Sequence, residues 1–159
     1  MTQQGPENLE GELVATDAKV AIVTARFNEF ITDRLTVAAI NTWERLGGKA
    51  ENLTSAHVPG AVELAVTAKK LAETGKYEAV ICLGCVIRGE TDHYDHVVDQ
   101  SAIGIREVGV QTGVPCIFGV LTCDTLEQAI DRAGTKMGNA GRSAMMTAVE
   151  MANLLKKIK

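Results

Sequence analysis

The residues best suited to chemistry lie in one polar segment, Arg88-Gly89-Glu90-Thr91-Asp92-His93. The segment follows an apolar run that predicts a buried strand and precedes a helix predicted from about residue 92 to residue 112. Free N–H groups at the start of a helix bind anions, and the helix dipole there disfavours protonation of a histidine. We therefore expect a phosphate site at this helix start, with His93 beside it as a neutral proton acceptor.

Two simpler interpretations of His93 stay open at this point. It is an exposed helix-start residue, or it binds a metal together with His96, since two histidines three positions apart can share a helix face. Acidic neighbours would add ligands to such a site: Asp92, Asp95 and Asp99. The sequence holds no further ligand cluster, and a structural zinc site would use the cysteines. We therefore expect no metal.

A second group of polar residues surrounds a glycine-rich stretch, residues 134–143. Its spacing does not fit a P-loop, because Lys136 stands where the first glycine is required and Arg142 where the lysine is required. The stretch also follows a predicted helix instead of a strand. Arg132 and Lys136 flank the bend, and two such cations can hold a phosphate. A solvated helix face explains Arg132 equally well.

Cysteines and aromatic residues need an interpretation by position. Cys82 and Cys85 form a C-x-x-C spacing inside the apolar run, and a step of three along a strand sends side chains to opposite faces. They are therefore predicted to be structural, neither a redox pair nor a metal site. Phe27 lies in a loop where a ring can stack on a flat ligand. Phe118 lies within a predicted strand, where core packing is expected.

These residues are positioned by an alternating pattern of strands and helices, which predicts an α/β fold with a parallel sheet and helices on both faces. Ligands bind such doubly wound folds beyond the carboxyl ends of the strands. Loops 26–28, 59–63, 88–93 and 122–125 should meet there. The predicted strands are 19–25, 53–58, 77–87 and 115–121, and the predicted helices are 28–46, 61–74, 92–112, one that opens at Thr125, and about 137–158.

Composition limits the possible classes of protein. The 159 residues are 46% hydrophobic and 23% charged, as in one ordinary globular domain, which we place at residues 13–159 after a flexible arm, residues 1–12. A net charge of −4 argues against a nucleic-acid binder. No apolar run is long enough to span a membrane, and the first residues are unlike a signal peptide, so a cytoplasmic location is expected.

Five segments, in order, resemble the 6,7-dimethyl-8-ribityllumazine synthase family. One such segment is weak evidence, but five in sequence are specific, and the resemblance runs from about residue 13 to the C-terminus. The segments are Ala25-Arg26-Phe27-Asn28, Val58-Pro59-Gly60-Ala61-Val62-Glu63, residues 83–93, Phe118-Gly119-Val120-Leu121-Thr122, and residues 127–139.

The resemblance implies a flavodoxin-like three-layer sandwich with a four-stranded parallel sheet. It implies condensation of 5-amino-6-(D-ribitylamino)uracil with 3,4-dihydroxy-2-butanone 4-phosphate, giving 6,7-dimethyl-8-ribityllumazine, phosphate and water, without a cofactor. It also implies homo-oligomers, as pentamers, decamers or an icosahedral capsid of 60 subunits, in which the N-terminal arm can add a strand to a neighbouring sheet.

The resemblance further implies a role for each matching residue. His93 shuttles protons, and Phe27 stacks on the pyrimidine. Phe118 and Arg132 come from the neighbouring subunit, with Arg132 on the phosphate. The other expected contacts are Ala61, Val62 and Glu63 with the ribityl chain, Cys85, Val86 and Ile87 with the ring through their backbone, and Glu90 and Thr91 with the phosphate.

Some positions depart from the family's usual residues, and two other functions remain to be separated. Val62 replaces a frequent aromatic residue, Ala65 a frequent proline, Ala140 a frequent lysine, and Glu90 a small residue. These changes bear on substrate affinity more than on the reaction. The other functions are a non-catalytic shell or scaffold that binds flavin-like ligands, and a riboflavin synthase of the same fold.

Overall fold

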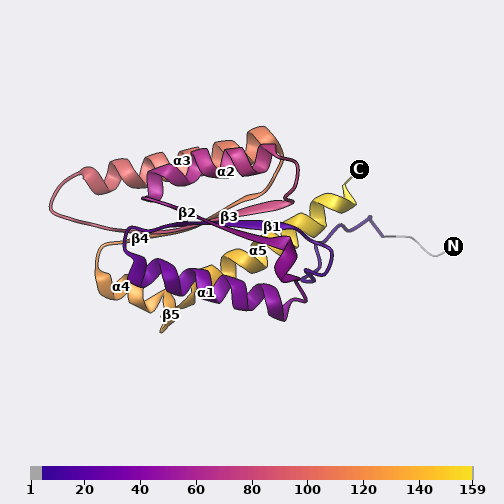
Figure 1. The fold of residues 1–159 in the computed structure, drawn as a ribbon, viewed down its shortest axis with the longest axis horizontal. Coiled ribbons are helices and arrows are strands. Elements are labelled where there is room, and N and C mark those ends of the chain that lie inside the picture. The colour runs from indigo at the N-terminus through magenta and orange to yellow at the C-terminus, as the bar shows by residue number, and fades with distance from the viewer. Residues whose placement is uncertain (1–4, 159) are drawn as a thin grey trace.

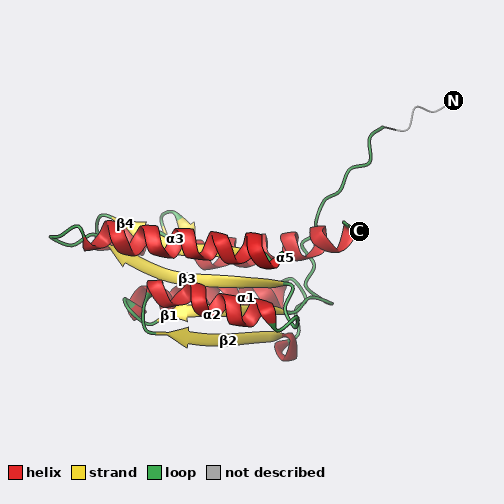
Figure 2. Cartoon of the chain, turned by 90° about the horizontal axis from the view of Figure 1, so that it is seen from above, coloured by secondary structure: helices red, strands yellow, loops and turns green. Residues whose placement is uncertain are grey.

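A parallel sheet with the strand order β2-β1-β3-β4 forms the centre of the computed structural model, which describes residues 5–158. The strands β1, β2 and β3 end on the same side of the molecule (Figure 2). In register, Val20 of β1 lies opposite both Leu53 and Ala79. The strands are β1 (Val20–Ala25), β2 (Leu53–Val58), β3 (Ala79–Ile87) and β4 (Cys116–Cys123).

Helices cover both faces of this sheet (Figure 1). One face carries α2 (Leu64–Glu73) and α3 (His93–Thr112). The other carries α1 (Glu29–Arg45), α4 (Leu126–Asp131) and α5 (Ala140–Lys157). Two 3₁₀ turns, η1 (Ala50–Asn52) and η2 (Ala61–Glu63), flank β2. No helix within residues 5–158 has the length and apolar character to cross a membrane.

The alternating side chains of the strands divide the hydrophobic core into two layers. Val20 and Ile22 of β1 pack on the side of α1 and α5, whereas Ala21 and Val23 pack on the side of α2 and α3. This is the period of two expected for a strand that is covered on both faces. The predicted α/β class and the flavodoxin-like three-layer arrangement are therefore confirmed.

The stretch between α4 and α5 differs from the predicted course of the chain. The final helix begins at Ala140 instead of near Met137, because the preceding residues form a small antiparallel hairpin of β5 (Ala133–Thr135) and β6 (Gly138–Asn139). Gly134 and Gly138 adopt positive φ angles of 116° and 77°, which L side chains disfavour. Asn139 then caps α5, since its side chain accepts hydrogen bonds from the N–H groups of Gly141 and Arg142.

The predicted N-terminal arm, residues 1–12, lies partly outside the described residues, and its flexibility stays a prediction. Residues 5–12 contain no helix or strand. The chain then meets α5, where Asn153 Nδ2 donates to the carbonyl oxygens of Glu12 (2.6 Å) and Val14 (2.8 Å). Gly11 also lies directly against the backbone of Glu150, where a side chain would overlap it. The start of the predicted domain is therefore attached to α5.

A close contact between α1 and α5 depends on Gly141 of α5, because a Cβ there would overlap the main-chain oxygen of Leu35 in α1. We expect Gly141→Ala to lower the free energy of unfolding by about 1–3 kcal/mol, since two backbones must move apart. Urea unfolding followed by fluorescence of the single tryptophan, Trp43, measures this at fixed protomer concentration. Gly109→Ala in α3 is the control, because its Cβ would make only ordinary contacts from 3.5 Å. An equal loss in both variants would contradict the argument.

Candidate active site

A cavity of about 610 Å³ opens at the carboxyl ends of the strands, where the sequence predicts a ligand site. Its walls come from the loop after β1, the η2 turn after β2, the end of β3 and the start of α3. The lining residues are Phe27, Asn28, Gly60, Ala61, Val62, Glu63, Cys85, Val86, Ile87, Gly89, Thr91, His93, Tyr94 and Val97. The separate segments thus form one site.

The loop after β1 presents the phenyl ring of Phe27 at the cavity, with the residue 72% exposed. Two backbone hydrogen bonds hold this loop against the chain after β2. The N–H of Arg26 donates to Val58 O (2.8 Å), and that of Phe27 donates to Pro59 O (3.1 Å). A large ring without apolar cover on a fixed loop is well placed to stack on a flat ligand.

The end of β3 forms one wall of the cavity. The side chain of Cys85 packs in the layer beside α1 and α5, and that of Val86 packs in the layer beside α2 and α3. Both residues line the cavity although at most 9% of each is exposed. Backbone N–H and C=O groups at this edge can recognise the polar edge of a heterocycle.

The thiols are unsuited to nucleophilic chemistry. Burial raises the pKa of Cys85 to about 12 and that of Cys116 to about 11, and it also raises the pKa of Cys82. At neutral pH these groups are therefore protonated, and the thiolate is the reactive form. All four cysteines are free, and Cys82 and Cys85 belong to opposite core layers, as predicted from their spacing.

The start of α3 supplies the polar wall of the cavity. His93 is the first residue of the helix, after Asp92 at the N-cap, and its N–H donates to Thr91 Oγ1 at 3.4 Å. Thr91 and His93 are both exposed and both line the cavity. The start of a helix, whose dipole favours an anion, and an imidazole thus lie in the same wall.

An ion-pair network supports the loop that leads into α3. Arg88 Nε donates to Asp124 Oδ1 at 2.8 Å, and its Nη1 lies 3.7 Å from Asp95 Oδ1. The guanidinium lies over the ring of Tyr94, 4.3 Å from its centroid. The hydrogen bond that Arg88 donates to Asp124 raises the pKa of Arg88. Arg88 is therefore held by the chain itself and connects the loops that follow β3 and β4.

The cavity brings together most of the residues singled out from the sequence, but four of them lie elsewhere. Glu90 is exposed outside the lining, and Lys136 lies on the exposed β5–β6 hairpin. Phe118 and Arg132 line a separate hollow of about 380 Å³ beside β4 and α5. Arg132 Nη1 there donates to Gln128 O at 3.0 Å.

Five lining residues were not predicted as site residues: Asn28, Gly60, Gly89, Tyr94 and Val97. Tyr94 and Val97 follow His93 at one and four positions along α3. Helical periodicity places residues four apart on one face, which was a usable signal for Val97. Asn28 belonged to a family segment, but no role was predicted for its side chain.

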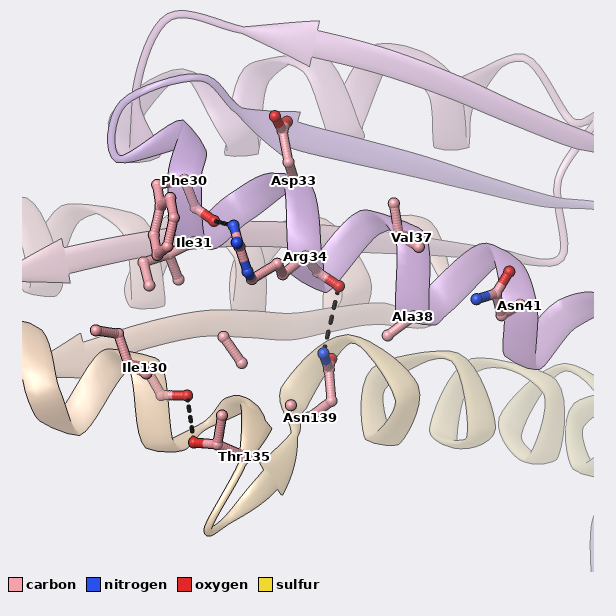
Figure 3. A pocket seen from close by; sticks show the side chains of 12 residues that line it. Phe30, Ile31, Asp33, Arg34, Val37, Ala38, Asn41, Ile130, Thr135 and Asn139 are labelled. Carbon is pink, nitrogen blue, oxygen red and sulfur yellow. Dashed lines mark hydrogen bonds between the residues drawn. The ribbon is translucent and has the colours of Figure 1, made fainter.

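A further hollow, of about 590 Å³, lies between α1 and the β5–β6 hairpin (Figure 3). Two of its polar side chains, Arg34 and Thr135, are engaged within the chain. The guanidinium of Arg34 lies 3.7 Å over the centroid of the Phe30 ring, and Thr135 Oγ1 donates to Ile130 O at 2.9 Å. Asp33 projects away from the hairpin in Figure 3. This hollow therefore offers mainly apolar surface and contains no histidine.

The metal interpretation of His93 and His96 gains no support from their surroundings. Within residues 5–158, no group of three or more His, Cys, Asp or Glu side chains is arranged to hold a metal ion. The absence of a metal and of any cofactor stays a prediction.

One comparison with known proteins bears on this site. A family model described as 6,7-dimethyl-8-ribityllumazine synthase matches residues 17–156. The matched region contains the whole sheet, α1 to α4, nearly all of α5, and every residue that lines the cavity.

Proposed function

This chain belongs to the 6,7-dimethyl-8-ribityllumazine synthase family, transferases of riboflavin biosynthesis, and we propose that it performs the condensation that forms the lumazine. In this reaction the 5-amino group of 5-amino-6-(D-ribitylamino)uracil attacks the ketone of 3,4-dihydroxy-2-butanone 4-phosphate, and water leaves as the imine forms. Elimination then releases phosphate. The ribitylamino nitrogen closes the second ring with loss of another water. The observation that carries the proposal is the single cavity that joins Phe27, the end of β3 and His93.

The pyrimidine substrate fits the side of the cavity formed by Phe27 and β3. The exposed Phe27 ring offers a face for stacking, and the main chain of Cys85, Val86 and Ile87 offers hydrogen-bonding groups to the ring edge. The hydroxyls of the ribityl chain then reach η2, where Ala61, Val62 and Glu63 line the same cavity.

The phosphate substrate fits the start of α3. In this proposal the anion lies beside Thr91 and is stabilised by the positive end of the α3 dipole. His93 lies in the same wall, where it can carry the protons that move when the imine forms and the second ring closes. Lys136 and Glu90, outside this cavity, are proposed to adjust the charge around the phosphate.

A neighbouring subunit completes the site in this proposal, because Phe118 and Arg132 line a hollow of their own instead of the cavity. We propose self-association as a pentamer or a larger assembly. Exposed apolar side chains on α2 and α3 support such contacts: Val66 (61% exposed), Ile103 (50%) and Val110 (80%). Large apolar side chains that gather on one surface typically mark an interface.

The proposed function predicts lumazine formation when the two substrates are mixed with the protein, measured by the absorbance of the product. His93→Ala should slow turnover by about 10²-fold, the lower end of the range for positioned proton transfer. His96→Ala is the matched control, because His96 is an exposed histidine on the same helix outside the cavity. Turnover by His93→Ala at the wild-type rate would contradict the role of His93. Ligand binding without any wild-type turnover would instead indicate a scaffold.

A further inference from the structure

β1 leaves the sheet at the edge of the active-site cavity. Thr24 is the last residue of β1 that lies opposite β3, with Leu83 as its partner. If the parallel ladder continued in this register, the N–H of Phe27 would donate to the carbonyl oxygen of Cys85. It donates instead to Pro59 O, so the chain has turned toward β2. The carbonyl of Cys85 therefore loses its expected backbone partner where the cavity begins.

The side chain of Asn28 takes the place of that partner. Its Nδ2 donates to Cys85 O at 2.9 Å, in a partly buried hydrogen bond that joins the loop after β1 to the end of β3. Both residues line the cavity. The Phe27 loop is therefore bonded to β3 through Asn28 and to the end of β2 and the residue after it through the N–H groups of Arg26 and Phe27. The side chain of Asn28 thus connects the Phe27 loop to the end of β3 at the cavity.

The backbone of Asn28 is equally unusual. With φ 61° and ψ 46°, it is the one non-glycine residue of positive φ within residues 5–158. Its carbonyl accepts hydrogen bonds from the N–H groups of Ile31 (2.9 Å) and Thr32 (3.1 Å) at the start of α1. Its side chain makes no capping hydrogen bond to this helix, although asparagine at a helix start commonly does. The side-chain amide of Asn28 therefore bonds to β3 instead of capping α1.

We propose that Asn28 is a positioning residue that fixes the spacing between the Phe27 ring and the main chain of β3, and so shapes the slot for the flat pyrimidine. The position needs a residue that adopts the left-handed conformation and also donates a hydrogen bond. Glycine meets only the first need, and aspartate, which tolerates the conformation, donates no hydrogen bond when ionised. The inference rests on the proposed function, because the slot is assigned to that substrate.

The test compares Asn28→Gly and Asn28→Asp with the wild type in steady-state kinetics, with each substrate varied in turn. Both variants keep a backbone that tolerates the turn, and thermal unfolding of each establishes that it is folded. We expect the KM of the pyrimidine to rise about 10-fold, with the KM of the phosphate substrate within about twofold of wild type. Glu29→Gln is the control, since Glu29 occupies the first turn of α1 outside the cavity.

The outcomes separate this inference from the function on which it depends. A selective rise for the pyrimidine in either folded variant, with no change in Glu29→Gln, supports the positioning role. Equal effects on both substrates would overturn it. So would a fall in kcat with both KM values unchanged, because a residue that only stabilises the start of α1 changes the fraction of active protein and not the affinity for one substrate. Calorimetric binding of the pyrimidine alone tests the same selectivity without turnover. An inactive wild type would count against the proposed function only.

Discussion

Arg132→Ala should lose about 10²–10³-fold in kcat/KM for the phosphate substrate, the loss typical when one group that stabilises a developing anion is removed. Arg132 is the partly buried cation at the end of α4, and a guanidinium can hold a phosphate through two parallel hydrogen bonds. In the proposed reaction it would stabilise phosphate both as bound substrate and as leaving group. Its present contact, one hydrogen bond to Gln128 O, leaves further donors free for a ligand.

The role is specific to one substrate, and this makes it testable. Equilibrium binding of the pyrimidine to Arg132→Ala should remain within about twofold of wild type, because the proposed contact is with phosphate alone. Arg142→Ala is the matched control, as Arg142 is an exposed cation at the start of the adjoining helix α5. Equal losses for the pyrimidine and the phosphate substrate would refute the assigned role.

Much of the fold could be predicted because the sequence features that define its strands and helices are local. β3 is apolar almost throughout, so a central buried strand was evident, and Gly75 and Gly113 stand just after α2 and α3. The β5–β6 hairpin was missed for a physical reason. Its two strands are short, and only a few backbone groups are paired between them. The course of the chain depends on two glycines with positive φ, and hydrophobic periodicity does not reveal such positions.

The site was predictable to the extent that it lies in loops after strands. The carboxyl ends of parallel strands meet at one edge, so Phe27, Glu63 and His93 were expected together and do line one cavity. No role was predicted for the side chain of Asn28, because its hydrogen bond to Cys85 depends on where β1 leaves the sheet. That departure is set by tertiary packing, and the sequence of residues 25–28 alone does not contain it.

The positions of Phe118 and Arg132 matter most for the assembly. Each chain has a cavity that contains His93 and, apart from it, a hollow that contains Phe118 and Arg132. If the hollow of one subunit completes the cavity of the next, the contact is head-to-tail, and such contacts generate closed rings when the rotation closes. Each active site would then draw on two chains, although every chain carries all the residues.

This arrangement predicts that two impaired variants restore activity when they share an oligomer. Co-expressed His93→Ala and Arg132→Ala chains should form mixed rings in which some sites combine an intact His93 from one chain with an intact Arg132 from its neighbour. Random mixing in equal amounts gives intact pairs at about a quarter of the interfaces, so turnover should recover to about a quarter of the wild-type value. The measurement is lumazine formation by purified mixed oligomers, with each variant alone as the baseline.

The control for this experiment is a mixture of the two variants purified separately and combined without exchange of subunits, which should stay at the baseline. The double variant His93→Ala/Arg132→Ala, co-expressed with wild type in equal amounts, also gives intact pairs at about a quarter of the interfaces and calibrates the expected recovery. If co-expressed single variants stay at the baseline while this calibration recovers, His93 and Arg132 act within one chain. The side chain of Arg132 would then have to reach the cavity of its own chain, and the neighbour would be dispensable for the chemistry.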